Sequence, residues 1–355
     1  MRILIDLTPL YKRKKTGVEM YAIDFYRALC KTHHTIIPIF HGMNELDNNV
    51  NAVIIPQNNR YILETFSLPK VIHSINADIA LFPIFPPSFK CYNTKTKIIP
   101  TLHDFAFIEF KETLSWKARL YLTPRYMFMF KKAYGIITIS ETIKRKLSEY
   151  TSKKVWNCGE NISEEYKVKS IKDASHLTKW NILPYNYIIS VSTIEPRKNL
   201  KYLLNIVQEP LLNSNFKIVL VGRKGWGKDE NLKSLIEKLG DKLIFTDYIT
   251  TEELIMLYHY AYSFALLSLD EGFGRTPFEA VACGCKRVIL SDIPIFRETF
   301  DGNATFLPLN DIKIASQKLD FNKLISVDKN FSLPFDVMEE RISEVLKSIE
   351  QSTNI

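Results

Sequence analysis

The segment at 267–299 constrains the fold more than any other, because it joins a strand end to a helix start through a glycine turn. The apolar run YSFALLSL at 262–269 has the length of a buried strand, and GFG at 272–274 follows it. Gly284 predicts the end of the helix that begins after the turn. Unpaired amides at a helix N-terminus favour an anion, so we expect a phosphate to bind at this turn.

Two carboxylates flank the turn. Glu271 precedes the glycines, and Glu279 lies in the first turn of the predicted helix, where Thr276 and Pro277 complete a capping box with it. A carboxylate accepts hydrogen bonds from neighbouring hydroxyl groups of a ribose or a hexose, so a phosphate site beside two carboxylates favours a nucleotide sugar. The alternative is that Glu279 only caps the helix and that Glu271 is a solvated loop acid.

A pair of cations follows another predicted strand. The run YIISVST at 187–193 has strand character, and Arg197 and Lys198 come shortly after it. Two cations at the carboxyl end of a strand can neutralise a diphosphate, whose negative charge grows as a glycosidic bond breaks. A solvated turn is the alternative for these two residues.

A near match to a phosphate-binding P-loop occurs further along the chain. Gly222, Gly227 and Lys228 have the spacing of that motif after a predicted strand. Asp229 stands where a P-loop needs a serine or threonine to bind magnesium. We therefore expect Gly222 and Arg223 to line a nucleotide site, and a P-loop-like NTP-binding protein is the alternative function.

Four motifs resemble, in order, those of one enzyme group. EGFGRTPFEAVACGC at 271–285 and SDIPIFRE at 291–298 resemble the donor-binding motif of retaining GT-B glycosyltransferases of the glycosyl transferases group 1 (family 4) type, which includes bacterial mannosyltransferases of surface polysaccharide assembly. SVSTIEPRKNLKYLL at 190–204 resembles the group's phosphate-binding segment, TGVEMYAIDFYRAL at 16–29 its first glycine loop and helix, and TLHDFAFIEF at 101–110 its His-Asp segment. The resemblance implies an α/β GT-B fold, in which two Rossmann-like doubly wound domains face a cleft.

The resemblance also implies roles for individual residues. Arg197 and Lys198 would stabilise the departing diphosphate, although the group often has Gly-Arg where this chain has Ser192-Thr193. Glu271 would hold sugar hydroxyls, and His103 would be a substrate contact or a base. The residues expected to bind the donor are Gly17, Val18, Gly222, Arg223, Ile249, Gly272, Phe273, Gly274, Arg275, Thr276 and Glu279, with Glu279 on the ribose.

The length of 355 residues is sufficient for two domains that each bury a core. Strand-like runs alternate with helical stretches, as a doubly wound sheet requires. We expect an acceptor-binding domain at 1–165, a polar linker at 166–186 and a donor-binding domain at 187–335. By analogy with GT-B folds, the last helix at 336–355 is expected to return to the first domain.

These motifs predict transfer of a hexose, with retention of configuration, from a nucleoside diphosphate sugar to a hydroxyl of a glycan. No Asp-x-Asp pair occurs in the sequence, so cations and a helix N-terminus would replace a metal, and we expect neither a metal nor a cofactor. GDP-mannose is the favoured donor, with UDP-sugars and deoxyhexose donors open. The expected acceptor is a polyprenyl-diphosphate-linked glycan of O-antigen, lipopolysaccharide or capsule synthesis. A non-catalytic GT-B sugar-binding subunit is a further alternative.

The formal net charge of +8 suits an anionic partner. The basic residues are dispersed and accompany no nucleic-acid-binding motif, so we expect no nucleic acid as a partner.

The five cysteines are odd in number and lack metal spacing, which indicates a reducing compartment. We expect neither a secretory signal nor a membrane span, and hence a cytoplasmic protein, peripheral on the inner membrane. Basic and aromatic residues at 111–132 suit an interfacial helix, with core packing as the alternative.

Overall fold

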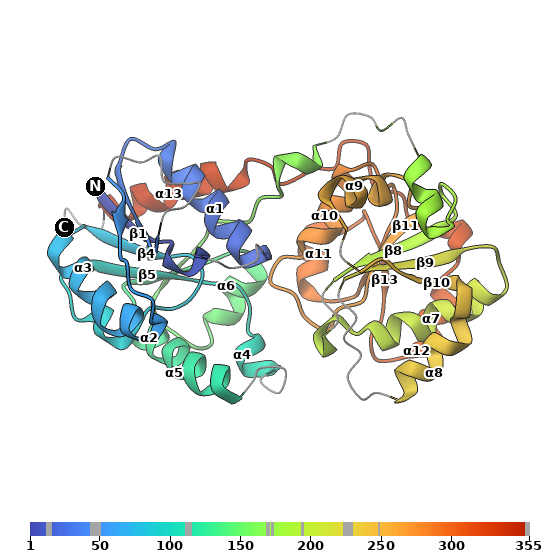
Figure 1. The fold of residues 1–355 in the computed structure, drawn as a ribbon, viewed down its shortest axis with the longest axis horizontal. Helices are drawn as coiled ribbons and strands as arrows, with labels where there is room; N and C mark the ends of the chain where they lie inside the picture. The colour runs from blue at the N-terminus through green and yellow to red at the C-terminus, as the bar shows by residue number, and fades with distance from the viewer. Residues whose placement is uncertain are drawn as a thin grey trace. The chain divides into compact units, whose positions relative to one another are not determined.

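The computed structural model describes residues 1–11, 16–42, 51–110, 116–167, 171, 174–192, 195–222, 230–247 and 249–351. The chain forms two compact units, Met1–Asn161 with Phe335–Ile355 and Ile162–Pro334 (Figure 1). Each unit has its own parallel sheet, so the prediction of an α/β fold with two Rossmann-like domains is confirmed.

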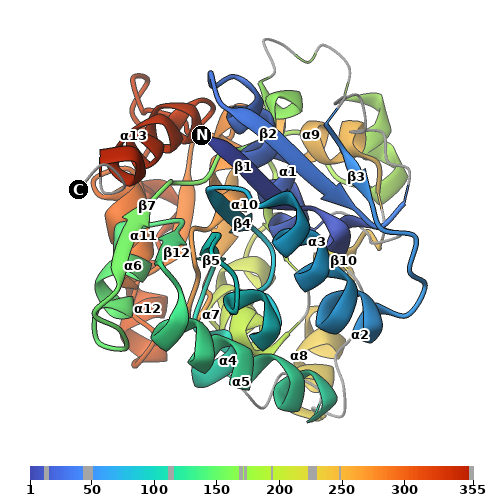
Figure 2. The ribbon, with the colours of Figure 1, turned by 90° about the vertical axis from the view of Figure 1, so that its left-hand side faces the viewer.

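The first unit contains a seven-stranded sheet in the order β3-β2-β1-β4-β5-β6-β7. The strands are β1 (Arg2–Asp6), β2 (Thr35–Phe40), β3 (Val53–Ile54), β4 (Ile79–Phe82), β5 (Lys97–Leu102), β6 (Gly135–Thr138) and β7 (Lys154–Asn157), and Figure 2 shows β1 and β2 side by side. All their pairings are parallel, and the residues of the central strands are mostly apolar and buried because helices cover both faces, whereas the edge strands β3 and β7 are only partly buried. The strand order reverses between β1 and β4, where open α/β sheets place ligands.

Helices connect the strands of this unit. They are α1 (Gly17–Cys30), α2 (Arg60–Ile62), α3 (Leu68–Ile75), α4 (Ala106–Glu109), α5 (Trp116–Lys132), α6 (Glu141–Leu147) and α13 (Val337–Gln351), with a π-helical turn η2 (Leu63–Ser67) after α2 and a short helix η1 (Thr8–Leu10) after β1. Helix α1 begins with a capping box of Thr16 and Glu19 and buries Tyr21, Phe25 and Leu29. Helix α13 packs against α1 (Figure 1), and Lys31 forms an ion pair with Glu339.

Helix α5 has one face in the core and another in solvent. Met129 and Phe130 are buried in a core cluster, whereas Trp116 and Leu120 are each 71% exposed. Pro124 lies inside the helix and does not end it. Among the residues that the structure describes, no helix combines the length and the apolar character needed to span a membrane.

The second unit contains a six-stranded sheet in the order β10-β9-β8-β11-β12-β13. The strands are β8 (Tyr187–Val191), β9 (Lys217–Val221), β10 (Leu243–Phe245), β11 (Ser263–Leu266), β12 (Val288–Ser291) and β13 (Thr305–Leu307), and all are parallel. The helices are α7 (Leu200–Leu212), α8 (Glu230–Leu239), α9 (Thr251–His259), α10 (Arg275–Ala282), α11 (Pro294–Phe300) and α12 (Ile312–Lys318), with a short helix η7 (Pro196–Lys198) before α7.

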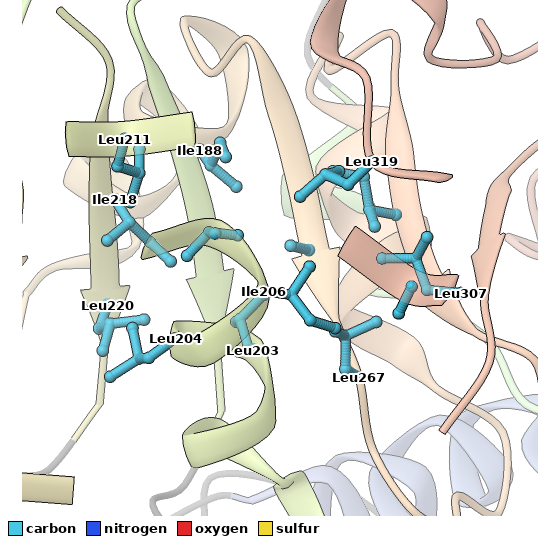
Figure 3. Close-up of a cluster of buried hydrophobic side chains, with 14 of the residues drawn as sticks. Ile188, Leu203, Leu204, Ile206, Leu211, Ile218, Leu220, Leu267, Leu307 and Leu319 are labelled. Carbon is cyan, nitrogen blue, oxygen red and sulfur yellow. The ribbon is translucent and has the colours of Figure 1, made fainter. Parts of the chain in front are cut away.

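A leucine- and isoleucine-rich core fixes the position of α7 on this sheet. Leu203, Leu204 and Ile206 of α7 pack against Ile218 of β9 and Leu267, which follows β11 (Figure 3). Full burial of such side chains contributes about 1.5–3 kcal/mol each, so the helix is held firmly over β8 and β9. The short helix η7 at the start of α7 is thereby placed at the carboxyl end of β8.

Candidate active site

The turn between β11 and α10 has the predicted strand-turn-helix form, but its cap differs from the prediction. Helix α10 begins at Arg275 with Gly274 as N-cap, and no side chain caps it. The predicted capping box of Thr276 and Glu279 is therefore wrong, because the helix starts one residue earlier than Thr276. The predicted end is confirmed: Gly284 has φ +101°, and Gly284 and Cys285 donate to carbonyl groups of the last turn, as in a Schellman motif.

Gly274 has to be a glycine for two reasons. Its φ is +84°, in the left-handed region, and a Cβ there would lie 2.6 Å from Cε1 of Phe296. The neighbouring Phe273 stacks on Phe278, with 5.1 Å between the ring centroids. The backbone of the turn is thus held close against α11, and the start of α10 has amide groups without a side-chain cap.

Glu271, Lys198 and Arg197 form one cluster, in which the carboxylate is buried and the two cations are partly buried. Oε1 of Glu271 accepts from Nζ of Lys198 at 2.6 Å, and Oε2 accepts from a guanidinium nitrogen of Arg197 at 3.1 Å. Glu271 is 6% exposed. Burial alone would raise its pKa, but the charges of Lys198 and Arg197 outweigh burial and lower the pKa of Glu271. The carboxylate is therefore ionised at neutral pH, and the two predicted cations meet on it.

Backbone contacts hold these cations in place. The guanidinium of Arg197 also donates to the carbonyl of Asp270 at 2.8 Å and to Glu195 at 3.0 Å. The amide of Leu269 donates to the carbonyl of Arg197 at 2.8 Å. Helix η7 and the loop after β11 are consequently joined by both backbone and side-chain bonds, which positions two positive charges beside the glycine turn.

Glu279 occupies a separate buried position in α10. Its Oε1 lies 3.6 Å from Nε of Arg275, and its Oε2 accepts from the hydroxyl of Tyr258 at 3.4 Å. Burial raises the pKa of Glu279, and Arg275 only partly offsets this effect. The two contacts are long, so this carboxyl can accept shorter hydrogen bonds from a ligand hydroxyl.

Gly222 and Ile249 lie at the carboxyl-end side of the same sheet. Gly222 follows β9 with φ +151°, and a Cβ there would lie only 2.2 Å from the carbonyl oxygen of Ser192. Ile249 is half-buried and precedes Thr250, the N-cap of α9. Arg223 and the rest of the near P-loop at 223–229 lie outside the described residues.

The remaining predicted site residues belong to the first unit. Gly17 and Val18 begin α1. His103 follows β5, is 9% exposed, and its Nε2 lies 2.7 Å from the carbonyl oxygen of Pro83. Burial lowers the pKa of His103, so the ring is neutral at pH 7. Because a carbonyl can only accept, Nε2 carries the proton and Nδ1 is left as an acceptor.

Two supporting residues were not predicted. Ser268 donates to Oε1 of Glu271 at 2.7 Å, and its three-residue spacing from Glu271 was a signal that could have been used. Tyr258 reaches Glu279 from α9 across 21 positions, and no local pattern marks such a pair.

Among the described residues, the His and acidic side chains close enough to share a metal are His33, His34 and Glu350, which belong to the first unit.

Comparison with known proteins gives consistent results. Residues 176–324 match the family described as Glycosyl transferases group 1. The serotype-specific mannosyltransferase WbdA of Escherichia coli is 33% identical over 171 residues, which cover 44% of this chain and 20% of WbdA. The O-antigen chain mannosyltransferase RfbU of Salmonella typhimurium is 27% identical over 215 residues, 60% of this chain and 57% of RfbU. The matches thus span a fifth to somewhat over half of these relatives.

A solved structure extends the likeness to the whole fold. Sucrose-phosphate synthase from Thermosynechococcus elongatus superposes with a TM-score of 0.72 at 15% identity, covering 99% of both chains. The family match lies within the second unit and includes η7, the glycine turn and α10. Residues 176–324 therefore match the glycosyl transferases of group 1, and the whole chain has the GT-B fold of two Rossmann-like units.

Proposed function

We propose that this protein is a retaining hexosyltransferase that moves mannose from GDP-mannose to a hydroxyl of a lipid-linked glycan, without a metal. The observation that carries the proposal is the cluster of Glu271, Lys198 and Arg197 beside the glycine turn of α10. The names of the relatives, mannosyltransferases of serotype and O-antigen synthesis, support mannose as the sugar and O-antigen synthesis as the process. A polyprenyl diphosphate as the lipid and the cytoplasmic face of the inner membrane as the place are parts of the same proposal.

The chemistry follows from the charges of the cluster. A bound diphosphate competes with Glu271 for Lys198 and Arg197, because a diphosphate group carries more negative charge than one carboxylate. The cations then stabilise the negative charge that grows on the diphosphate as the bond from the anomeric carbon to phosphate oxygen breaks. Glu271, released from part of its ion pairing, accepts hydrogen bonds from the sugar hydroxyls. Uncapped amides at the start of α10 add to the anion site.

The acceptor hydroxyl attacks the anomeric carbon from the face that the diphosphate leaves. Its proton passes to the departing phosphate oxygen, so the new glycosidic bond forms with retention and needs no separate base. The neutral His103, with Nδ1 as acceptor, is suited to hold a hydroxyl of the donor or acceptor. The protein contributes mainly positioning and charge stabilisation.

Thermal unfolding with nucleoside diphosphates tests the donor site. GDP is expected to raise the Tm of the wild type more than UDP, dTDP or ADP, with and without a chelator. Glu279→Ala and Glu271→Gln should both reduce the shift. Transfer of labelled mannose from GDP-mannose to a lipid-linked glycan then tests the reaction. If the protein binds GDP-mannose in the presence of the acceptor but shows neither transfer nor slow hydrolysis of the donor, the proposal of a catalytic role is contradicted.

We further propose that α5 touches the membrane surface. Trp116, Leu120, Met127 and Lys131 are exposed and recur at helical spacing, so they share one face of α5. Exposed Phe89 packs its ring 4.8 Å from Phe128 beside this face. The wild type is expected to co-sediment with vesicles that contain anionic lipid, and the double variant Trp116→Ser, Leu120→Ser is expected to co-sediment less. Equal sedimentation of the wild type and the double variant would contradict the proposal.

A further inference from the structure

A pocket of about 380 Å³ with a mixed polar and apolar lining lies within the first unit, after the carboxyl ends of β1 and β2. Its volume is in the range of small-ligand sites. It borders β1, at which the strand order of the sheet reverses. The lining side chains that matter here are Thr8, Tyr11, His41, Asn58, Arg60 and Glu64. None of them belongs to the cluster around Glu271, which is part of the second unit.

A charged network forms one wall of this pocket. Glu64, in the π-helical turn after α2, accepts from Nε of Arg60 and from a guanidinium nitrogen of Arg125, each at 2.5 Å. The hydroxyl of Tyr121 donates to the same carboxylate. Glu64 is 8% exposed and Arg125 5%. Such a network holds Arg60 at the pocket with its side chain half exposed.

A second buried acid lies at the end of β1. Oδ1 of Asp6 accepts from both the amide and the hydroxyl of Thr8, at 3.1 and 2.7 Å. Neither bond uses Oδ2. Asp6 adds one negative charge near Glu64 and Arg60. The charge of Glu64 raises the pKa of Asp6, and the charge of Arg60 lowers it.

The charges of the described residues around the pocket balance. Arg60 and Arg125 supply two positive charges, and Glu64 and Asp6 supply two negative charges at neutral pH. An anionic ligand such as a phosphate would have to break an existing ion pair. A neutral ligand with many hydroxyl groups needs only hydrogen bonds, which carboxylate, guanidinium and amide groups provide.

The other wall is aromatic. The ring of Tyr11 lies 4.2 Å from that of His41, and a Cβ at Gly42 would lie 2.8 Å from the Tyr11 ring, so this glycine makes room for it. Nε2 of His41 contacts the carbonyl of Gln57, while Nδ1 is buried and has no hydrogen-bond partner among the described residues. Tyr11 is 36% exposed, and an aromatic ring at a pocket wall can pack on the apolar CH face of a sugar.

We propose that this pocket binds one neutral sugar residue of the acceptor glycan. The inference rests on the proposed function, which supplies a glycan as acceptor, and it locates one sugar of that glycan in the first unit. The Tyr11 ring packs on the CH face of the sugar. Arg60, Glu64 and Asn58 exchange hydrogen bonds with its hydroxyls.

Saturation-transfer NMR on the full chain, with methyl α-D-mannopyranoside and an α-linked mannobiose as probes, tests the site. Tyr11→Ala and Arg60→Gln should each weaken binding by about tenfold, which corresponds to about 1.4 kcal/mol. Asn58→Ala, an exposed position, should weaken it without affecting folding. Tyr61→Ala and Arg27→Gln are matched controls outside the pocket, since Tyr61 is 59% exposed and Arg27 pairs with Asp24 three residues away. Both controls should bind as the wild type does.

The possible outcomes separate this inference from the proposed function. GDP stabilisation without glycoside binding would overturn the sugar site and leave the donor site standing. Glycoside binding that depends on Tyr11 and Arg60, without any effect of GDP, would support the sugar site and count against the transferase. Displacement of the glycoside by inorganic phosphate, dependent on Arg60, would overturn the assignment to a neutral sugar. Equal weakening in the controls would overturn it as well.

Discussion

Lys198 and Glu271, 73 residues apart in sequence, meet at 2.6 Å in the second unit, and Arg197 reaches the other oxygen of the same carboxylate. Lys198 and Arg197 are each 15% exposed at the side chain, so the charges are largely shielded from water. The pairing joins the two segments that the sequence singled out separately. Removing one partner of this pairing should therefore destabilise the fold.

Lys198→Met is expected to lower the free energy of unfolding by about 3 kcal/mol at pH 7, because it leaves a buried carboxylate with one cation fewer. The pKa of Glu271 is lowered in the folded state from its usual 4.5. Its stabilising contribution is therefore present above pH 4.5 and is lost as the pH falls through the folded-state value. Urea unfolding from pH 3 to pH 7 should show the difference between wild type and mutant narrowing towards acid.

Lys233→Met is the matched control for this measurement. Lys233 pairs with Glu230 at 2.6 Å, but the side chains are 46% and 79% exposed. Its loss should change stability by less than about 0.5 kcal/mol. A similar small effect of Lys198→Met would mean that the cluster does not contribute to folding.

Glu279→Gln is expected to stabilise the protein and to weaken nucleotide binding. The pKa of Glu279 is raised by burial, so the folded protein holds this proton over a range in which the unfolded chain has released it. The free energy of unfolding therefore falls as the pH rises above 4.5, because the buried carboxyl group resists ionisation in the folded state. The amide of a glutamine stays neutral, so the variant does not lose this free energy. Thermal unfolding at pH 5 and pH 8 should show the larger gain at pH 8. A smaller Tm shift with GDP should accompany it; an unchanged shift would exclude Glu279 from the donor site.

The local parts of the site could be predicted from the sequence. A buried strand, two glycines and a helix end leave short-range patterns, and the structure has them at β11, Gly274 and Gly284. The cap of α10 was misassigned because Thr276 with Glu279 matches a capping box, whereas the left-handed conformation of Gly274 starts the helix earlier. Thr16 with Glu19 matches the same motif and does form it.

The long-range parts could not be predicted. Nothing in the sequence near Glu64 indicates that Arg125 and Tyr121 meet it, since the partners are 61 and 57 residues away. Burial of Asp6 is similarly invisible, because the strand RILID ends in an acid that a solvent-exposed loop would also accommodate. Such contacts depend on the strand order, which local periodicity does not encode.

Asp6→Asn is expected to stabilise the protein above pH 6. Burial raises the pKa of Asp6 from 3.8 to about 6. Between these values the folded state retains a proton that the unfolded state loses, so stability falls as the pH rises, and the loss is complete above about pH 6. Two pKa units correspond to about 3 kcal/mol. Unfolding at pH 4 and pH 7.5 should show the gain only at pH 7.5; Asp241→Asn, at an exposed position, should show none.

Gly222→Ala should be among the most damaging single-methyl additions in the second unit. The new Cβ would lie 2.2 Å from the carbonyl oxygen of Ser192, and φ +151° disfavours any side chain. We expect a loss of about 3–4 kcal/mol in chemical unfolding, and weaker GDP binding because the ends of β8 and β9 must separate. Gly240→Ala is the control: its φ of +50° is also left-handed, but no atom lies within 4 Å, so only about 1 kcal/mol should be lost. Equal losses would show that backbone conformation alone, and not the close approach to Ser192, requires glycine at 222.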